Sequence, residues 1–204
     1  PKAVILQGKS GLGKHRLAQW LAETAHEAGM AQVLMAEHDP IAGPAHGLPH
    51  MFANLFHTRN LNGPEVVERT SDMLKQIGID DAYESQALAR ILLSASGALT
   101  NPSTVSTGTL SERLAIYERI VQQMAEHRPI IIVLKNAQWA PEALQFATRL
   151  MRSRGTELPV LVVLTCDTEA VVHHQREKRH IEAIASLPTS ETIHLEPLQP
   201  NETV

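Results

Sequence analysis

The sequence predicts a three-layer α/β domain with a parallel five-stranded sheet. Short runs of consecutive apolar residues alternate with longer amphipathic segments, a pattern typical of strands buried on both faces and connected by helices. A glycine-rich segment follows the first apolar run and precedes the first amphipathic segment. The chain has 204 residues, of which 43% are apolar, so we expect one domain with a substantial core.

Five apolar segments are expected to form the strands, at residues 3–7, 32–36, 130–134, 160–164 and 192–195. The first helix is predicted over residues 14–28, with Leu17, Trp20 and Leu21 on its buried face. Thr109 and Glu112 have the spacing of a capping box, which predicts a helix that ends before Pro129. Further helices are expected at residues 141–152 and 171–187.

The segment from about residue 40 to 108 interrupts this alternation and is expected to be a helical insertion. Short helices are predicted near residues 51–56, from Pro64 onward, and at 82–95. Residues 94–108 are rich in Ser, Thr and Gly, so we expect an exposed loop there. The histidines in and before this segment match no common metal-binding spacing and are expected in loops or at the surface. They are His38, His46, His50 and His57.

Composition excludes several classes of protein. The net charge of −4 argues against direct nucleic-acid binding and against a polybasic membrane-surface protein. The single cysteine, Cys166, excludes an internal disulfide and is expected to be a core thiol. No signal peptide or membrane-spanning run is visible, and the chain starts at Pro1, so we expect a cytoplasmic fragment of a longer multidomain protein.

The glycine-rich segment has the spacing G-x-x-x-x-G-K and consists of Gly8, Lys9, Ser10, Gly11, Leu12, Gly13 and Lys14. Its glycines let successive backbone N–H groups point at one anion, and the following helix adds its positive end. A lysine at the last position supplies a charge to terminal phosphates. The segment therefore predicts a phosphate-binding loop (P-loop) for ATP or ADP.

These residues resemble the signalling P-loop ATPases called STAND or AAA+-like, found in large LuxR-type regulators and fused to cyclases and kinases. Residues 8–17, GKSGLGKHRL, are similar to that family's GEAGIGKSRL. Residues 128–139, RPIIIVLKNAQW, resemble its RPLVLVLDDLQW. Softer matches are GLPHMF at 47–52, LPVLVVLTCD at 158–167 and HLEPL at 194–198. The resemblance implies a P-loop NTPase fold with strand order 5-1-4-3-2, used as a nucleotide-controlled switch.

The sequence departs from the family at the positions that bind Mg²⁺ and activate the attacking water. His15 stands in place of the Ser or Thr that binds Mg²⁺, and Lys135 and Asn136 replace the two Walker B acids. In the degenerate sensor region, Asp167 follows Thr165 where the family often has Arg. Lysine repels Mg²⁺ and asparagine cannot accept a proton, so weak or absent Mg²⁺ binding and impaired hydrolysis are expected.

The resemblance thus implies a pseudo-ATPase that binds ATP or ADP in a signalling or regulatory module. Its partners would be other domains of the same chain or signalling proteins, and a homo-oligomer is possible. Two alternatives remain open at this point. Glu37 and Asp39, just past the second strand, could supply relocated catalytic acids in an active ATPase. The domain could also be a protein-interaction module with an empty loop.

Overall fold

The computed structural model describes residues 1–41, 46–95, 108–153 and 158–197. Its centre is a sheet of five parallel strands in the order β2-β3-β4-β1-β5. This is the expected order, read from the opposite edge, and it confirms the P-loop NTPase fold. The strands are β1 (Lys2–Gly8), β2 (Gln32–Glu37), β3 (Ile130–Lys135), β4 (Val160–Asp167) and β5 (Ser190–His194).

The predicted helices are present with small changes in their bounds. They are α1 (Lys14–Glu27), α2 (Gly47–Leu55), α3 (Gly63–Gln76), α4 (Ala82–Ala95), α5 (Leu110–Ala125), α6 (Pro141–Arg152) and α7 (Gln175–Ala185). The predicted helix over residues 171–187 divides into a short 3-10 helix, Val171–His173, and α7. Most of the loop predicted at 94–108 lies outside the described residues. No helix of the described ranges is both long enough and apolar enough to cross a bilayer.

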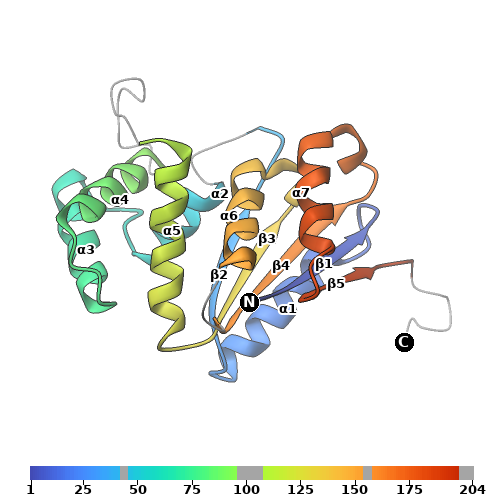
Figure 1. Cartoon of the computed structure of the whole chain (residues 1–204), viewed down its shortest axis with the longest axis horizontal. Helices are drawn as coiled ribbons and strands as arrows, with labels where there is room; N and C mark the ends of the chain where they lie inside the picture. The colour runs from blue at the N-terminus through green and yellow to red at the C-terminus, as the bar shows by residue number, and fades with distance from the viewer. Residues whose placement is uncertain (42–45, 96–107, 154–157, 198–204) are drawn as a thin grey trace.

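The strand order explains how the helices divide between the two faces. The connection from β1 to β2 runs toward one edge of the sheet, whereas every later connection runs toward the other edge. Because crossovers between parallel strands are right-handed, α1 must lie on one face and the later helices on the other. Figure 1 shows α6 and α7 in front of the sheet and α5 to their left, beyond the β2 edge. Among the described helices that connect the strands, α1 alone therefore covers its face of the five-stranded sheet.

The larger core lies under the later helices. Phe52, Tyr117 and Phe146 from α2, α5 and α6 are fully buried there. The rings of Phe52 and Tyr117 stack at 4.3 Å between centroids, and Phe146 meets both edge-on. The insertion thus shares its core with the sheet, because α2 contributes one of the three rings.

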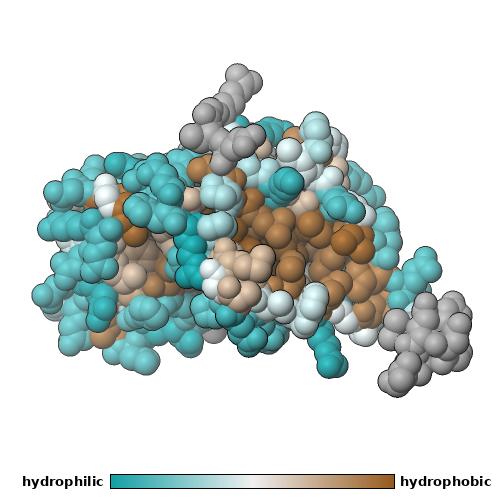
Figure 2. Space-filling model, turned by 90° about the horizontal axis from the view of Figure 1, so that it is seen from below, coloured by the Kyte–Doolittle hydropathy of each residue, from teal (hydrophilic) through white to brown (hydrophobic). Residues whose placement is uncertain are grey.

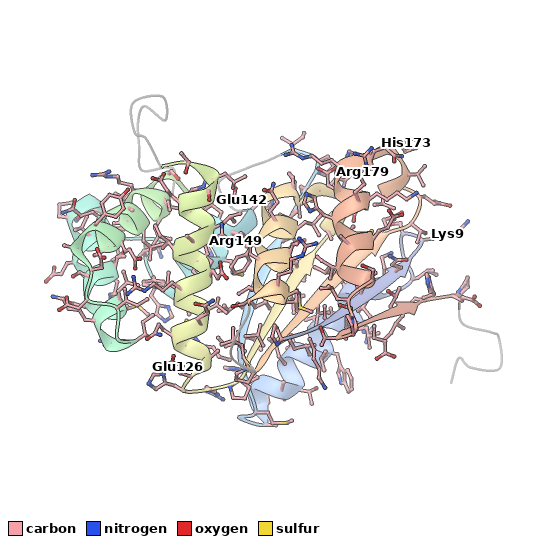
Figure 3. The ribbon with its side chains drawn as sticks, viewed as in Figure 1. Lys9, Glu126, Glu142, Arg149, His173 and Arg179 are labelled. Atoms are coloured by element: carbon pink, nitrogen blue, oxygen red, sulfur yellow. The ribbon has the colours of Figure 1, made fainter. Side chains whose placement is uncertain are left out.

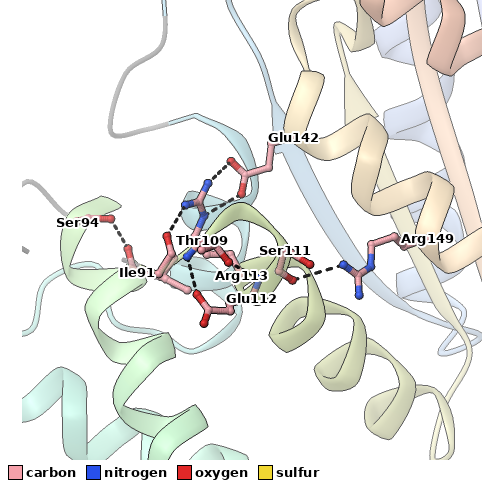
Figure 4. A network of polar contacts seen from close by, with 9 residues as sticks. Ile91, Ser94, Thr109, Ser111, Glu112, Arg113, Glu142 and Arg149 are labelled. Carbon is pink, nitrogen blue, oxygen red and sulfur yellow. Dashed lines mark hydrogen bonds and ion pairs between the residues drawn. The ribbon is translucent and has the colours of Figure 1, made fainter. Parts of the chain in front are cut away.

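Polar contacts hold α5 and α6 against each other (Figure 4). Arg113 of α5 donates to both carboxylate oxygens of Glu142, at 3.2 and 3.3 Å. Arg149 of α6 donates to Glu118 at 3.0 Å. The predicted capping box at Thr109 is confirmed, since its side chain accepts from the Glu112 backbone and the Glu112 side chain accepts in return.

The prediction for the buried face of α1 is wrong for Trp20 and Leu17, whereas Leu21 is half-buried and packs against the core. Trp20 is 60% exposed and Leu17 is 39% exposed. The buried residues of α1 are Lys14, in the loop, and Ala18, Ala22 and Ala25, against the sheet. Alanine methyl groups let α1 lie close to the strands, and no described helix covers its outer side. The side chains of Trp20 and Leu17 therefore remain in solvent.

Candidate phosphate-binding site

The loop from Gly8 to Lys14 leaves the carboxyl end of β1 and enters α1, as the motif requires. Its base is held by Leu195, whose N–H donates to the Gln7 carbonyl at 2.7 Å. A Cβ atom at position 8 would lie 2.8 Å from the Leu195 carbonyl oxygen, so only glycine fits there. The segment after β5 therefore closes against the first residue of the loop.

Backbone conformation shapes the rest of the loop. Gly11 and Gly13 both adopt left-handed conformations, with φ of 83° and 81°. Side-chain-bearing residues rarely take up this conformation, which turns the chain so that α1 begins directly at Lys14. The free N–H groups of the first turn of α1 thus point out of the loop, where they can bind an anion. Ser10 is exposed and Leu12 half-buried along this turn.

The Lys14 side chain folds back into the loop and is only 7% exposed. Its ammonium donates to the carbonyl oxygens of Gly8, at 2.8 Å, and Lys9, at 2.5 Å. An ammonium has three N–H donors, so one remains for a ligand. The charge is therefore held in the centre of the loop. Lys9 instead extends to the margin of the molecule (Figure 3), where it pairs with Glu169 at 3.0 Å.

The end of β3 places the two replaced acid positions beside the loop. Lys135 is the last residue of β3 and lies in register with Glu37 of β2. Asn136 follows in a left-handed conformation, with φ of 57°. Its backbone N–H donates to the buried Thr165 hydroxyl, and its side-chain amide donates to the His38 carbonyl, both at 3.0 Å. The Asn136 side chain thus holds two strand ends together.

The imidazole of His15 is half-buried beside this group. Its Nε2 is buried and has no hydrogen-bond partner of good geometry among the described residues. Burial lowers the pKa of His15, and the nearby Lys135 ammonium lowers this pKa further, while the Asn136 side chain and Glu37 oppose the change. His15 is therefore neutral at pH 7 and offers an unused nitrogen in the site.

His38 lies in the loop just past β2, as expected, but its side chain is buried. It is only 7% exposed, and its Nδ1 is 2.9 Å from the Lys135 carbonyl oxygen. Burial lowers the pKa of His38, against a smaller opposing effect of this contact. Asp39, next to it, pairs with His46 at 3.0 Å. Sequence reasoning missed His38, although its place just past the second strand put it at the same sheet edge as Asn136.

Asp167 lies at the expected place but has a local structural role. Its Oδ1 accepts from the backbone N–H groups of Glu169, at 2.8 Å, and Ala170, at 3.0 Å, which fixes the turn after β4. Its own N–H donates to the Gln138 side chain at 3.2 Å. Cys166 is buried as expected, and burial raises its pKa to about 11. Asp167 therefore fixes the backbone turn after β4, and it does not supply the positive charge that an arginine would place at this position.

The two buried histidines predict how stability depends on pH. Protonation of His38 and His15 is easier in the unfolded chain, because folding lowers both pKa values from about 6.5. Stability should be complete above pH 6.5 and decline below it, by up to about 1.4 kcal/mol per pH unit for each histidine. Urea unfolding at pH 5–7 measures this. His38→Gln should make the free energy of unfolding fall less steeply with decreasing pH. His26→Gln, on the exposed surface of α1, is the control and should leave this slope unchanged. The same slope in the natural protein and both variants would contradict the expectation.

Other concave surfaces lie away from this site. An apolar groove of about 1100 Å³ opens at the amino ends of the strands, lined among others by Met30, Pro129, Ile131 and Leu161. It is the brown surface in the middle of Figure 2, at the opposite end of the sheet from the loop. In the described ranges, no three His, Cys, Asp or Glu residues are grouped to hold a metal ion.

Comparison of the sequence with protein families and with curated proteins gives no match. Solved structures with similar coordinates are distant. The Aeropyrum pernix ORC1 protein in complex with DNA aligns with 99% of this chain at 15% identity and a TM-score of 0.43. The plasmid coupling protein TrwB with the ATP analogue ADPNP covers 89% at 13% identity and 0.40, and the ATPase domain of G40P covers 94% at 13% and 0.40.

This chain spans 41% of the ORC1 protein and 68% of each of the other two. Similarity at this level is compatible with many functions, so the ligands of those proteins are not transferred to this chain. The fold rests instead on the strand order β2-β3-β4-β1-β5 and on the loop between β1 and α1. By both criteria, the chain is a domain with the P-loop NTPase fold.

Proposed function

We propose that this domain binds ATP or ADP through the loop of residues 8–14 and does not hydrolyse ATP efficiently. The observation that carries the proposal is the contrast between two halves of one site. The glycine loop and Lys14 are intact, while Lys135 and Asn136 occupy the end of β3. The site thus keeps the groups that hold phosphate and lacks those that hold a metal ion.

The groups present fit a polyphosphate. Backbone N–H groups of the glycine turn and of the first turn of α1 would bind phosphate oxygens. The spare N–H of Lys14 would donate to the same ligand, and Lys135 would add a second positive charge from β3. The Nε2 of His15 is buried beside these groups and has no partner of good geometry among the described residues. ATP supplies four negative charges to this cationic site.

The same residues do not fit Mg²⁺, which prefers carboxylate, hydroxyl and water oxygens. His15 offers nitrogen, Lys135 repels a cation, and the amide of Asn136 is already bonded to the His38 carbonyl. We therefore infer that nucleotide binds without a metal, with the Lys135 ammonium as the counter-charge. Phosphoryl transfer would then lack both metal stabilisation and a base for the attacking water.

The resemblance to signalling ATPases supports a regulatory role, in which nucleotide binding alone changes contacts with other domains or partner proteins. The alternative of relocated catalytic acids is weakened by the environment of those acids. Asp39 is paired with His46, and Glu37 lies in register with Lys135, an opposite charge. Glu37 remains the better of the two candidates for a catalytic acid, because its carboxylate has no partner of this kind in direct contact among the described side chains.

Release of inorganic phosphate from ATP tests this proposal. With saturating ATP and Mg²⁺, we expect the same rate for the natural protein as for Lys14→Ala, since neither turns over. Steady release that Lys14→Ala abolishes would contradict the proposal and favour the active ATPase. In that case Glu37→Gln would show whether the relocated acid performs the chemistry, with Glu191→Gln on exposed β5 as the matched control.

A further inference from the structure

The outer face of α1 carries a tryptophan, Trp20, which is 60% exposed. Four residues of α1 point away from the sheet, because they lie opposite the buried alanines on the helical wheel. They are Arg16, Trp20, Glu23 and Glu27, and all four are exposed. Within the described ranges no other crossover helix lies on this face of the sheet, in keeping with the strand order.

Other partly exposed apolar side chains lie along α1 and on the strands beneath it. Leu17, one turn earlier, is 39% exposed, and Leu21 is only half-buried. The strand residues to either side of α1, Met35 of β2 and Leu161 of β4, are likewise only half-buried. Tryptophan with more than half its surface in solvent is rare in isolated proteins and frequent at the centres of protein interfaces.

On the outer face of α1, the positive charge lies toward the start of the helix and the negative charges lie toward its end. Arg16 lies in the first turn, and Glu23 and Glu27 lie in the last two turns. Arg16 has no ion partner among the described residues, and Glu23 accepts only from Gln19. A second α1 running antiparallel would place acids opposite Arg16 and an arginine opposite the acids. The charges on the outer face of α1 are therefore complementary to those of a second, antiparallel copy.

We propose that this face of α1 binds a second copy of the chain, with the two α1 helices antiparallel about a two-fold axis beside Trp20. Arg16 and Glu23 are equally far from that axis, about 5 Å along the helix on either side at 1.5 Å per residue. Each Arg16 then meets Glu23 of the partner subunit, and the two Trp20 rings share the centre. This isologous pairing closes on itself. It does not depend on the proposed nucleotide binding.

Sedimentation velocity from about 1 to 500 µM protein tests this pairing. We expect a reversible dimer that Trp20→Glu weakens by about tenfold or more, since tryptophan anchors carry much of the binding energy of an interface. Glu68→Arg on exposed α3 is the control and should leave the dimer unchanged. Thermal melting of each variant shows that it is folded. A monomer throughout the range, or a dimer insensitive to Trp20→Glu, would overturn the proposal.

Charge exchange tests the antiparallel arrangement itself. Arg16→Glu and Glu23→Arg should each weaken the dimer several-fold, and the double variant should recover most of the loss, because each chain carries both members of the pair. In a Trp139→Phe background, Trp20 is the only tryptophan, and its emission should shift to the blue as the dimer forms. Failure of the double variant to recover affinity, or an unchanged emission, would contradict this geometry.

Discussion

Replacing Lys14 by alanine is expected to weaken ATP binding about 30- to 150-fold, which corresponds to about 2–3 kcal/mol. The Lys14 ammonium is the charged donor at the centre of the loop, and it is already oriented by two carbonyl oxygens before a ligand arrives. Because this donor is nearly buried, water competes with it less than at the surface. Titration with a fluorescent ATP analogue measures the loss.

Lys9→Ala provides the matched control, since Lys9 belongs to the same loop but is exposed and paired with Glu169. A surface pair of this kind is worth at most about 1 kcal/mol, so its loss should change the affinity for ATP by less than about fivefold. Melting curves of both variants show whether the loop change has altered the fold. Unchanged affinity in folded Lys14→Ala would mean that the loop does not bind the phosphates.

Changing Lys135 is expected to alter the metal requirement of the site. In EDTA, Lys135→Ala should bind ATP about 5- to 30-fold more weakly, because a charged hydrogen bond of about 1–2 kcal/mol is lost. Lys135→Asp should bind still more weakly in EDTA, since it places a carboxylate beside Glu37 and near the phosphates. Added Mg²⁺ should then restore binding of the aspartate variant by about tenfold or more, because two carboxylates now favour the ion.

Lys75→Ala, on the exposed surface of α3, removes the same charge far from the loop and should bind ATP as the natural protein does. Calorimetric titrations with and without Mg²⁺ distinguish these outcomes. If Lys135→Ala binds ATP normally in EDTA, the counter-charge comes from elsewhere. If Lys135→Asp gains nothing from Mg²⁺, the end of β3 is not positioned to hold a metal near the nucleotide.

The strands and the loop are predictable from sequence because local rules determine them. Each central strand is a continuous apolar run, which only a strand covered on both faces can accommodate. Lys14, Gly13 and the Thr109 capping box depend on neighbours within a few residues, and all three have the expected conformation. The spacing of residues along the sequence was therefore sufficient to predict these features.

The burial of Trp20 and of His38 was not predicted correctly, because both depend on distant parts of the chain. Trp20 was expected inside, yet the exposure of α1 depends on the order of all five strands, which leaves this helix without an outer layer. His38 was expected in a loop or at the surface; it lies in a loop, but its burial against the carbonyl of Lys135, 97 positions away, was not predicted. Hydrophobicity of single residues cannot reveal either arrangement, because both arise from parallel pairing between distant segments.

The most direct test of a metal-free nucleotide site is one titration of the natural protein with labelled ATP, in excess EDTA and again in excess Mg²⁺. We predict saturable binding in EDTA with an affinity equal to or higher than that in Mg²⁺, because Lys14 and Lys135 face the uncomplexed polyphosphate. Binding that strictly requires Mg²⁺ would contradict the assignment of Lys135 as counter-charge. Absence of binding at millimolar ATP in both conditions would contradict nucleotide binding altogether.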